Sequence, residues 1–223
     1  MTDAIDAPDA FAMTAATWLS STIAEVVHQR GECHLALSGG TTPFATFALL
    51  ADMTLDWDLV HLWQVDERVA PDGDPSRNAV GLHESLIARV AIPAANVHLM
   101  DVTAGDLDGA AAAYGSALAT ACGGVLDIVH LGLGADGHTA SWPPGDPVID
   151  IDDRDVALSA VYQGHVRMTL TVPCVNRARR RLFLVTGPDK AGPLASLLAA
   201  DGTIPANRVT LDETTILSNI LSN

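Results

Sequence analysis

The chain has 223 residues, of which 48% are hydrophobic, and it carries a formal net charge of −15. The apolar fraction is sufficient for a folded core and excludes a disordered chain, while the excess of carboxylates argues against a nucleic-acid partner, because phosphate backbones are bound by basic surfaces. No apolar run reaches the roughly 18 residues of a membrane span, and the acidic N-terminus lacks the basic segment of a secretory signal, so we expect a cytoplasmic protein without a membrane partner.

Helical and strand patterns alternate along the chain. We expect strands at residues 33–37, 60–65, 97–99, 127–132, 156–161, 168–172 and 182–185, and helices at 10–29, 44–53, 76–90, 107–121 and 190–200, with a last helix after Asp212. This alternation predicts an α/β fold with a doubly wound, mostly parallel sheet and helices on both faces, of the Rossmann-like kind. No repeat or linker divides the sequence, so residues 1–223 are expected to form a single domain. Ligands of such sheets bind at the carboxyl ends of the strands, so the residues that directly follow strands are the candidates for function.

The first candidate segment, Ser38-Gly39-Gly40-Thr41-Thr42-Pro43, joins the first strand to a helix. Two glycines allow the backbone to approach a ligand closely, and the hydroxyls and free N–H groups of a helix start can hold an anion. The segment is neither a Walker loop nor Gly-x-Gly-x-x-Gly, so it does not specify a nucleotide. A tight turn without a ligand explains it equally well.

The second candidate segment, Asp66-Glu67-Arg68, follows the strand that ends at Val65. Three charges at a strand end are costly unless they are solvated or used. Arg68 could pair with a carboxylate or reach a ligand anion, and Asn78 lies where the next helix begins. A solvated charge cluster is the alternative interpretation.

The third candidate segment, Gly132–Ser141, contains three glycines and follows a strongly apolar strand. His138 is therefore expected at the carboxyl end of that strand, beside the ligand-binding site. Histidine is the side chain best suited to proton transfer near neutral pH. Asp136, two residues earlier in a tight turn, could orient the imidazole or hold a substrate hydroxyl. We interpret His138 as a catalytic base.

The remaining reactive side chains have simpler interpretations. Four histidines fall within strands and are expected to be sheet-face residues: His34, His61, His98 and His130. No His-x-x-x-His or Glu-x-x-His spacing in the sequence predicts a metal site. The three cysteines are far apart and suit a reducing cytosol. Lys190 is the only lysine among twelve basic residues, which invites a functional interpretation, although compositional drift would also leave one lysine.

Taken in order, the three segments resemble the 6-phosphogluconolactonase family. Two later stretches are also similar to it: Arg167-Met168-Thr169-Leu170-Thr171 and Thr186-Gly187-Pro188-Asp189-Lys190-Ala191. The resemblance extends from about Gly31 to Asp212. It implies hydrolysis of 6-phospho-D-glucono-1,5-lactone in the oxidative pentose phosphate pathway, without a cofactor or a metal. It also implies a small sugar-phosphate substrate as the partner of a monomer or homodimer.

The resemblance assigns roles to particular residues. His138 would be the base, Asp136 its partner, and Arg68 a group that stabilises the developing oxyanion. The phosphate would lie on the loop of Ser38, Gly39, Gly40, Thr41 and Thr42, with Arg167 and Lys190 as counter-charges. Asp66, Arg68 and Asn78 would line the sugar end.

Two rival interpretations remain. Glucosamine-6-phosphate deaminases share the fold but resemble Asp-Glu-Tyr at the second segment, and Arg68 with Thr139-Ala140-Ser141-Trp142 fits the lactonase pattern better. A non-catalytic sugar-phosphate sensor would carry an extra DNA-binding module, for which there is no room before residue 31. The sequence departs from the lactonase pattern at Trp142-Pro143-Pro144-Gly145 and at Gln163-Gly164-His165.

Overall fold

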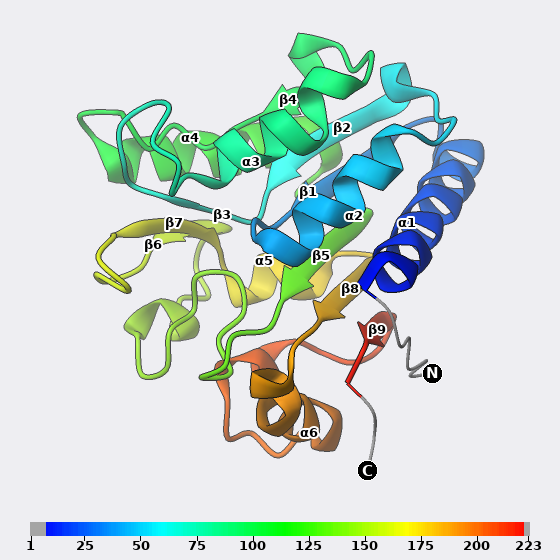
Figure 1. Ribbon diagram of the computed structural model, residues 1–223. Helices are drawn as coiled ribbons and strands as arrows, with labels where there is room; N and C mark the ends of the chain where they lie inside the picture. The colour runs from blue at the N-terminus through cyan, green and yellow to red at the C-terminus, as the bar shows by residue number, and fades with distance from the viewer. Residues whose placement is uncertain (1–7, 221–223) are drawn as a thin grey trace.

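The computed structural model describes residues 8–220 and contains a six-stranded sheet with the strand order β4-β2-β1-β5-β8-β9. Its strands are β1 (Cys33–Leu37), β2 (Val60–Gln64), β4 (Val97–His98), β5 (Ile128–Gly132), β8 (Arg180–Val185) and β9 (Thr214–Ser218). Every pairing in this sheet is parallel. The chain winds outward from β1 to β4 and then outward on the other side from β5 to β9, so the expected doubly wound α/β sheet is confirmed (Figure 1).

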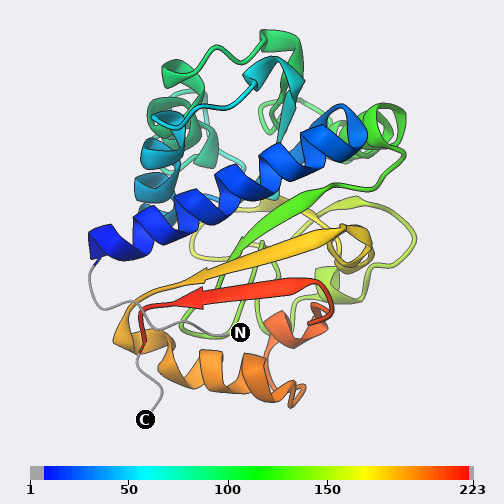
Figure 2. The same cartoon turned by 90° about the vertical axis from the view of Figure 1, so that its right-hand side faces the viewer.

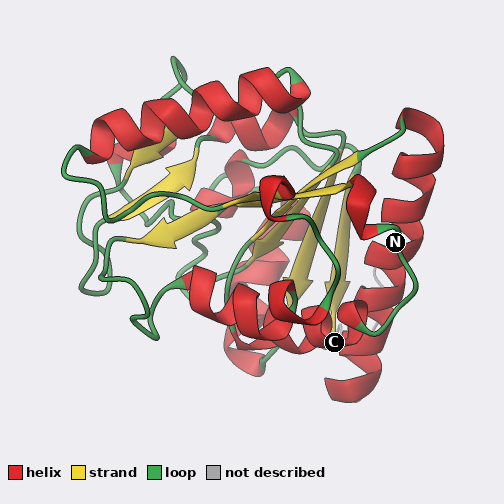
Figure 3. Ribbon diagram, turned by 90° about the horizontal axis from the view of Figure 1, so that it is seen from above, coloured by secondary structure: helices red, strands yellow, loops and turns green. Residues whose placement is uncertain are grey.

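Helices cover both faces of the sheet (Figure 3). The sheet has an apolar core on each face. The first core contains residues of three helices: α1 (Pro8–Arg30), α2 (Thr41–Ala51) and α3 (Asn78–Ser85). The second contains residues of α4 (Leu107–Cys122), α5 (Val172–Arg177) and α6 (Ala191–Ala199). Strand side chains alternate between the two cores: Leu182 and Leu184 belong to the first, and Phe183 and Val185 to the second. This period of two is what places a helical layer on each face.

Helix α1 runs alongside the strands of the six-stranded sheet, with its axis roughly aligned with that of β8 (Figure 2). By length and composition alone, residues Ala10–Arg30 are apolar enough to cross a membrane. Its apolar residues nevertheless recur every three or four positions, and this row is buried in the core that covers β1 and β8: Phe11, Ala15, Leu19, Ile23 and Val26. The helix therefore covers the sheet with one face.

A second, three-stranded antiparallel sheet lies beside the first, with the order β3-β7-β6. It consists of β3 (Asp66–Arg68), β6 (Val156–Leu158) and β7 (Arg167–Leu170). Val65 joins the two sheets, because its N–H donates to Leu37 O of β1 at 3.0 Å while its carbonyl accepts from Leu170 N of β7 at 2.8 Å. The strand expected to end at Val65 is therefore followed directly by another strand, because residues 66–68 continue the chain into the second sheet.

Two other expected elements differ from the structure. The helix predicted after Asp212 was wrong, because Thr214, Thr215 and Ile216 are β-branched and pair with β8 as the edge strand β9. The helix predicted at 76–90 is shorter, since Leu86 leaves helical geometry and a 3₁₀ turn follows. Short 3₁₀ turns occur at Trp57–Leu59, Ile87–Arg89, Ala94–Asn96, Pro147–Asp150, Pro188–Lys190 and Pro205–Arg208.

Candidate active site

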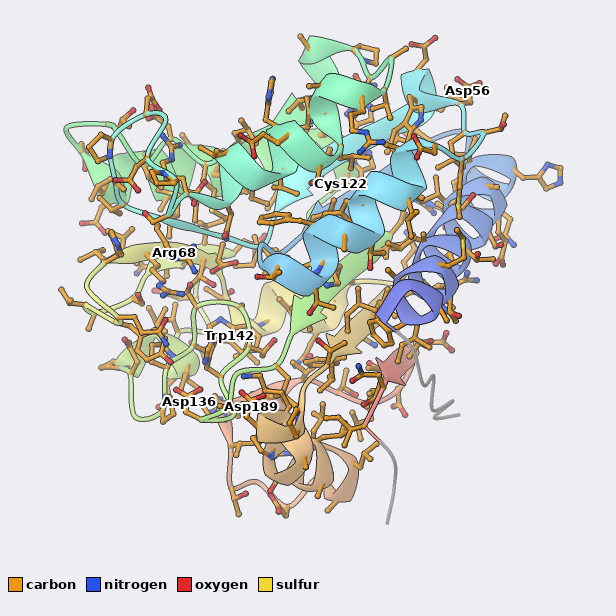
Figure 4. All side chains as sticks on the ribbon, viewed as in Figure 1. Asp56, Arg68, Cys122, Asp136, Trp142 and Asp189 are labelled. Carbon is orange, nitrogen blue, oxygen red and sulfur yellow. The ribbon has the colours of Figure 1, made fainter. Side chains whose placement is uncertain are left out.

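A cavity of about 390 Å³ lies at the carboxyl ends of the strands, where the sequence placed the site. Eleven of the twelve predicted residues line it: Ser38, Gly39, Gly40, Thr41, Thr42, Asp66, Arg68, Asn78, His138, Arg167 and Lys190. The twelfth, Asp136, lies behind the imidazole of His138, and Figure 4 shows it on the loop after β5, below Arg68. A larger hollow of about 620 Å³ between α4 and β6 contains none of these residues. The structure therefore brings eleven of the twelve predicted residues together at one cavity, while their roles stay a prediction.

The loop between β1 and α2 is tied to its neighbours by two of its hydroxyls. Ser38 Oγ donates to His130 O at 3.0 Å, so this hydroxyl is already used within the protein. Thr42 Oγ1 lies 2.6 Å from Thr186 Oγ1, which joins the loop to the end of β8. Gly39 has no room for a side chain, since a Cβ would lie 1.9 Å from Asn78 Oδ1. The loop therefore presents chiefly its backbone, and the first N–H groups of α2 have no helical acceptor.

Two of the three charged side chains of the second segment, Asp66 and Glu67, are buried, and Arg68 is half-buried. Glu67 is fully buried, and its carboxylate accepts N–H groups of Arg68, Asn78 and Ala79 at 2.7–2.8 Å. It also accepts from Gln64 Nε2 at 3.0 Å. Because these donors include the first N–H groups of α3, Glu67 stabilises the start of that helix. Glu67 itself does not line the cavity, whereas its neighbours in sequence, Asp66 and Arg68, do.

Asp66 is almost entirely buried beside the cavity. Its Oδ2 accepts the hydroxyl of Ser141 at 2.6 Å, and Asn78 Nδ2 donates to its backbone carbonyl at 2.9 Å. Burial raises the pKa of Asp66, and the bond from Ser141 and the charge of Arg167 act against that shift. Arg68 is held by a bond from Nη1 to Ser76 O.

His138 and Asp136 form a pair inside a glycine-rich turn. Gly137 N donates to Gly134 O at 3.0 Å, Gly134 N donates to His138 O at 2.8 Å, and Asp136 Oδ1 lies 2.6 Å from His138 Nδ1. Burial alone would raise the pKa of Asp136, but hydrogen bonds from Tyr162 and His138 outweigh it and lower this pKa to about 2. The carboxylate is therefore ionised near neutral pH and accepts the Nδ1 proton. Nε2 is then the nitrogen with a free lone pair, as a general base requires.

Cationic side chains line the cavity although the whole chain is strongly acidic. Arg68, Arg167 and Lys190 line it together with one carboxylate, that of Asp66. Arg167 is 3% exposed, and its Nε has no partner within the described chain. Lys190 Nζ lies 2.6 Å from Asp189 Oδ2. Such a cavity is suited to a ligand that carries an anionic group.

Three residues to which the sequence analysis assigned no role also belong to the site. Thr139 is 1% exposed and lines the cavity, and its hydroxyl has no partner among residues 8–220. Gln163 also lines the cavity, and Tyr162 donates to Asp136 Oδ2 at 2.7 Å. No spacing motif marks these residues. The only available signal is Gln163-Gly164, a dipeptide at the tip of a hairpin where both residues have positive φ.

The four strand histidines lie within strands as expected, and two of them meet Glu32. Glu32 Oε1 lies 3.1 Å from His34 Nε2, and Glu32 Oε2 lies 3.7 Å from His61 Nε2. Trp63 Nε1 donates to His34 Nδ1 at 3.1 Å, which places the His34 proton on Nε2 and leaves that atom without a lone pair for a metal. The two rings are stacked with 25° between their planes, so their Nε2 atoms do not converge on one ion. This geometry favours a hydrogen-bonded cluster over a metal site.

Comparison with known proteins places these features in a family. The profile of "Glucosamine-6-phosphate isomerases/6-phosphogluconolactonase" matches residues 6–217. A 6-phosphogluconolactonase from Synechocystis sp. is 35% identical over 189 residues, which cover 82% of this chain and 78% of that protein. The GDH/6PGL endoplasmic bifunctional protein of Oryctolagus cuniculus is 38% identical over 82% of this chain, but the match spans only 24% of that longer protein. The crystal structure of 6-phosphogluconolactonase from Thermotoga maritima superposes with a TM-score of 0.89 at 25% identity, over 98% of each chain.

Proposed function

The chain belongs to the family of glucosamine-6-phosphate isomerases and 6-phosphogluconolactonases, and we propose that it hydrolyses 6-phospho-D-glucono-1,5-lactone to 6-phosphogluconate in the oxidative pentose phosphate pathway. The observation that carries this proposal is one cavity that combines the Asp136–His138 pair with three cationic side chains. The pair supplies a base, and the cations suit a phosphorylated substrate. The relatives named 6-phosphogluconolactonase support the choice of reaction within the family.

The reaction opens an activated ester, so it needs no covalent enzyme intermediate. His138 Nε2 takes a proton from a water molecule as its oxygen bonds to C1 of the lactone. The bond between C1 and the ring oxygen then breaks, and the imidazolium returns the proton to that oxygen. General acid–base catalysis of this kind contributes about 10²–10⁴-fold. Asp136 holds the ring through Nδ1 and stabilises the imidazolium that forms.

The other residues bind the substrate and stabilise charge. Arg68, with backbone N–H groups of the glycine-rich turn, is the donor for the oxyanion that develops at C1. The phosphate lies on the loop from Ser38 to Thr42, which leads into the first turn of α2, with Arg167 and Lys190 as counter-charges. Asp66 and Asn78 contact sugar hydroxyls.

The proposal extends to the context of the enzyme. We propose that residues 1–223 act as one domain, as a monomer or homodimer, in the cytoplasm, with neither cofactor nor catalytic metal. Three free cysteines, Cys33, Cys122 and Cys174, support a reducing compartment.

A direct assay tests the function. Freshly generated 6-phosphogluconolactone is supplied, and the acid released on ring opening is followed by pH-stat after subtraction of spontaneous hydrolysis. The protein should accelerate ring opening and release no ammonia from glucosamine 6-phosphate. Ammonia release without lactone opening would assign the chain to the deaminase branch of the family, and neither activity would favour a sugar-phosphate sensor.

A further inference from the structure

The hairpin between β6 and β7 extends from the second sheet to the catalytic pair. Ser159 N donates to Arg167 O at 2.8 Å at the base of the hairpin, and Tyr162 and His165 form an antiparallel bridge near its tip. At the tip, Gln163 and Gly164 have φ values of 50° and 88°, as the central residues of a type I′ turn require. The turn is therefore well defined, and it places Tyr162 against the loop after β5.

Tyr162 contacts both members of the catalytic pair. Its hydroxyl donates to Asp136 Oδ2 at 2.7 Å, while the other carboxylate oxygen, Oδ1, lies 2.6 Å from His138 Nδ1. Its phenol oxygen is also 3.2 Å from His138 Nδ1, and the two rings meet edge to face with centroids 5.3 Å apart. Each oxygen of the Asp136 carboxylate thus has its own partner.

This second partner matters because Asp136 is not buried. Its side chain is 37% exposed, and an exposed ion pair or hydrogen bond contributes little, since water competes and the side chain loses rotamer freedom. A carboxylate held at both oxygens has lost that freedom before substrate binds. The His138 ring is then held with Nε2 free for the reaction.

Tyr162 is itself held from the cavity side. Gln163 Nε2 donates to the Tyr162 oxygen at 3.0 Å, and Arg167 Nη2 donates to Gln163 Oε1 at 3.2 Å. The Arg167 guanidinium lies 5.0 Å from the centroid of the Tyr162 ring. Because the phenol oxygen accepts from Gln163, its own proton is free to point to Asp136. Burial and the Asp136 hydrogen bond raise the pKa of Tyr162 to about 12, so the donor remains protonated through neutral pH.

We propose that Tyr162 is a positioning residue that holds the Asp136 carboxylate on His138, and that Gln163 and Arg167 hold Tyr162 in turn. This proposal rests on the proposed lactone hydrolysis for its kinetic consequences, but its geometry is independent of the substrate. The titratable groups in contact with His138 are Asp136 on its own loop and Tyr162 on the hairpin, and the charged side chains that line the same cavity are Asp66, Arg68, Arg167 and Lys190. Removing the phenol hydroxyl leaves more of the Asp136 charge to stabilise the imidazolium form of His138.

The kinetic test is Tyr162→Phe, which keeps the ring and removes only the hydroxyl. We expect kcat to fall roughly tenfold, near the lower end of what a hydrogen bond to a charged group contributes, with KM nearly unchanged. The acid limb of the pH–rate profile should move to higher pH. Gln163→Ala should produce the same shift to a smaller extent.

Tyr114→Phe is the matched control, because Tyr114 is the only other tyrosine and its hydroxyl bonds to backbone groups in the core. This variant should lose thermal stability without moving the pH–rate profile. A shift of the same size in Tyr114→Phe would mean that the profile reports general loosening of the fold, and would overturn the proposal.

A spectroscopic readout separates this inference from the proposed reaction. The Nδ1–H proton of His138, assigned by its absence in His138→Gln, should exchange slowly with water in the wild type and much faster in Tyr162→Phe. Unchanged exchange together with an unchanged pH–rate profile would overturn the positioning role, even if the wild type hydrolyses the lactone. Conversely, faster exchange in a protein that lacks lactonase activity would support the positioning role and refute the proposed function.

Discussion

Gly134 leaves the space that the imidazole of His138 occupies: a Cβ on Gly134 would lie 2.0 Å from His138 Nδ1 and 2.6 Å from Asp136 Oδ1. Such distances are far inside van der Waals contact. The glycine therefore allows the backbone of the turn to pass directly beneath the hydrogen bond that orients the base.

Gly134→Ala should consequently displace the His138 ring and break its contact with Asp136. We expect kcat to fall by about 10²-fold, since a misplacement of about 1 Å at a catalytic group has that effect. Gly105→Ala is the control, because no atom lies within 4 Å of a Cβ built there. Steady-state kinetics of both variants test whether the His138 ring is displaced. A near-normal kcat in Gly134→Ala would show that the turn adjusts and that His138 keeps its catalytic position.

His138→Gln removes the proposed base and keeps a polar side chain of similar length. We expect kcat to fall by about 10²–10⁴-fold, with the melting temperature nearly unchanged, because His138 contacts the protein mainly through Asp136 and Tyr162. Lactone opening is measured at fixed pH after subtraction of the uncatalysed rate. A variant that retains more than about half of the wild-type kcat would require another base.

Glu67→Gln tests the buried carboxylate at the start of α3. One amide NH₂ group would replace a carboxylate oxygen that now accepts N–H groups, so a buried donor would face donors at a cost of about 1–3 kcal/mol. The melting temperature should fall by about 3–10 °C. Glu25→Gln is the matched control, since Glu25 forms an exposed pair with Arg180 that should contribute little. Equal melting temperatures for the two variants would contradict the role of Glu67.

The sequence predicts the six-stranded sheet well except for its last edge strand, because buried parallel strands are apolar runs that glycines and polar residues interrupt. Residues that follow such strands must meet at one edge, which is why Ser38, Arg68 and His138 could be grouped without a structure. In the second sheet, β6 and β7 were expected as strands, but β3 was missed for the opposite reason. Asp66-Glu67-Arg68 has the composition of a solvated loop, and only the donors on α3 and the hydroxyl of Ser141 allow it to be buried.

The hairpin residues could not be predicted for a related reason. Tyr162 contacts Asp136 across 26 positions of sequence through a single hydroxyl, and no period or spacing encodes such a contact. The edge strand β9 was missed because five residues are too few for a hydrophobic pattern to separate a strand from a helix.

Stability should decrease on mild acidification because buried histidines resist protonation. Burial lowers the pKa of His130 to about 3 and that of His98 to about 4, and it also lowers the pKa of His61. Below about pH 6.5 the unfolded chain binds protons that the folded state does not, so the folded state loses stability as the pH falls toward these lowered values. For the fully buried His130, the loss between pH 6.5 and pH 5 is up to about 2 kcal/mol.

Urea unfolding at pH 7.5, 6.5 and 5.0 checks this expectation. The free energy of unfolding should change little between the first two pH values and fall clearly at the third. His98→Gln should reduce the difference between pH 6.5 and pH 5.0, whereas His28→Gln, on the exposed end of α1, should leave it unchanged. An unfolding free energy that is independent of pH would show that these histidines take up protons in the folded state.

Lys190 should determine the preference for a phosphorylated substrate. It follows β8 just before α6, lines the cavity and pairs with Asp189. The phosphate does not react, so its contacts stabilise the ground state and the transition state equally, and their loss raises KM while kcat changes little. A charge-assisted hydrogen bond contributes about 1.5–3 kcal/mol, so Lys190→Ala should raise KM by roughly 10–150-fold.

Kinetics with two lactones separate this role from a structural one. The unphosphorylated lactone should be a poor substrate for the wild type, and its turnover should be nearly unaffected by Lys190→Ala, because no phosphate is present to lose a contact. Arg89→Ala, which removes an exposed cation paired with Asp52, should change neither KM and so controls for net charge. If Lys190→Ala impairs both lactones equally, Lys190 does not bind the phosphate, and its contribution is to hold the turn between β8 and α6.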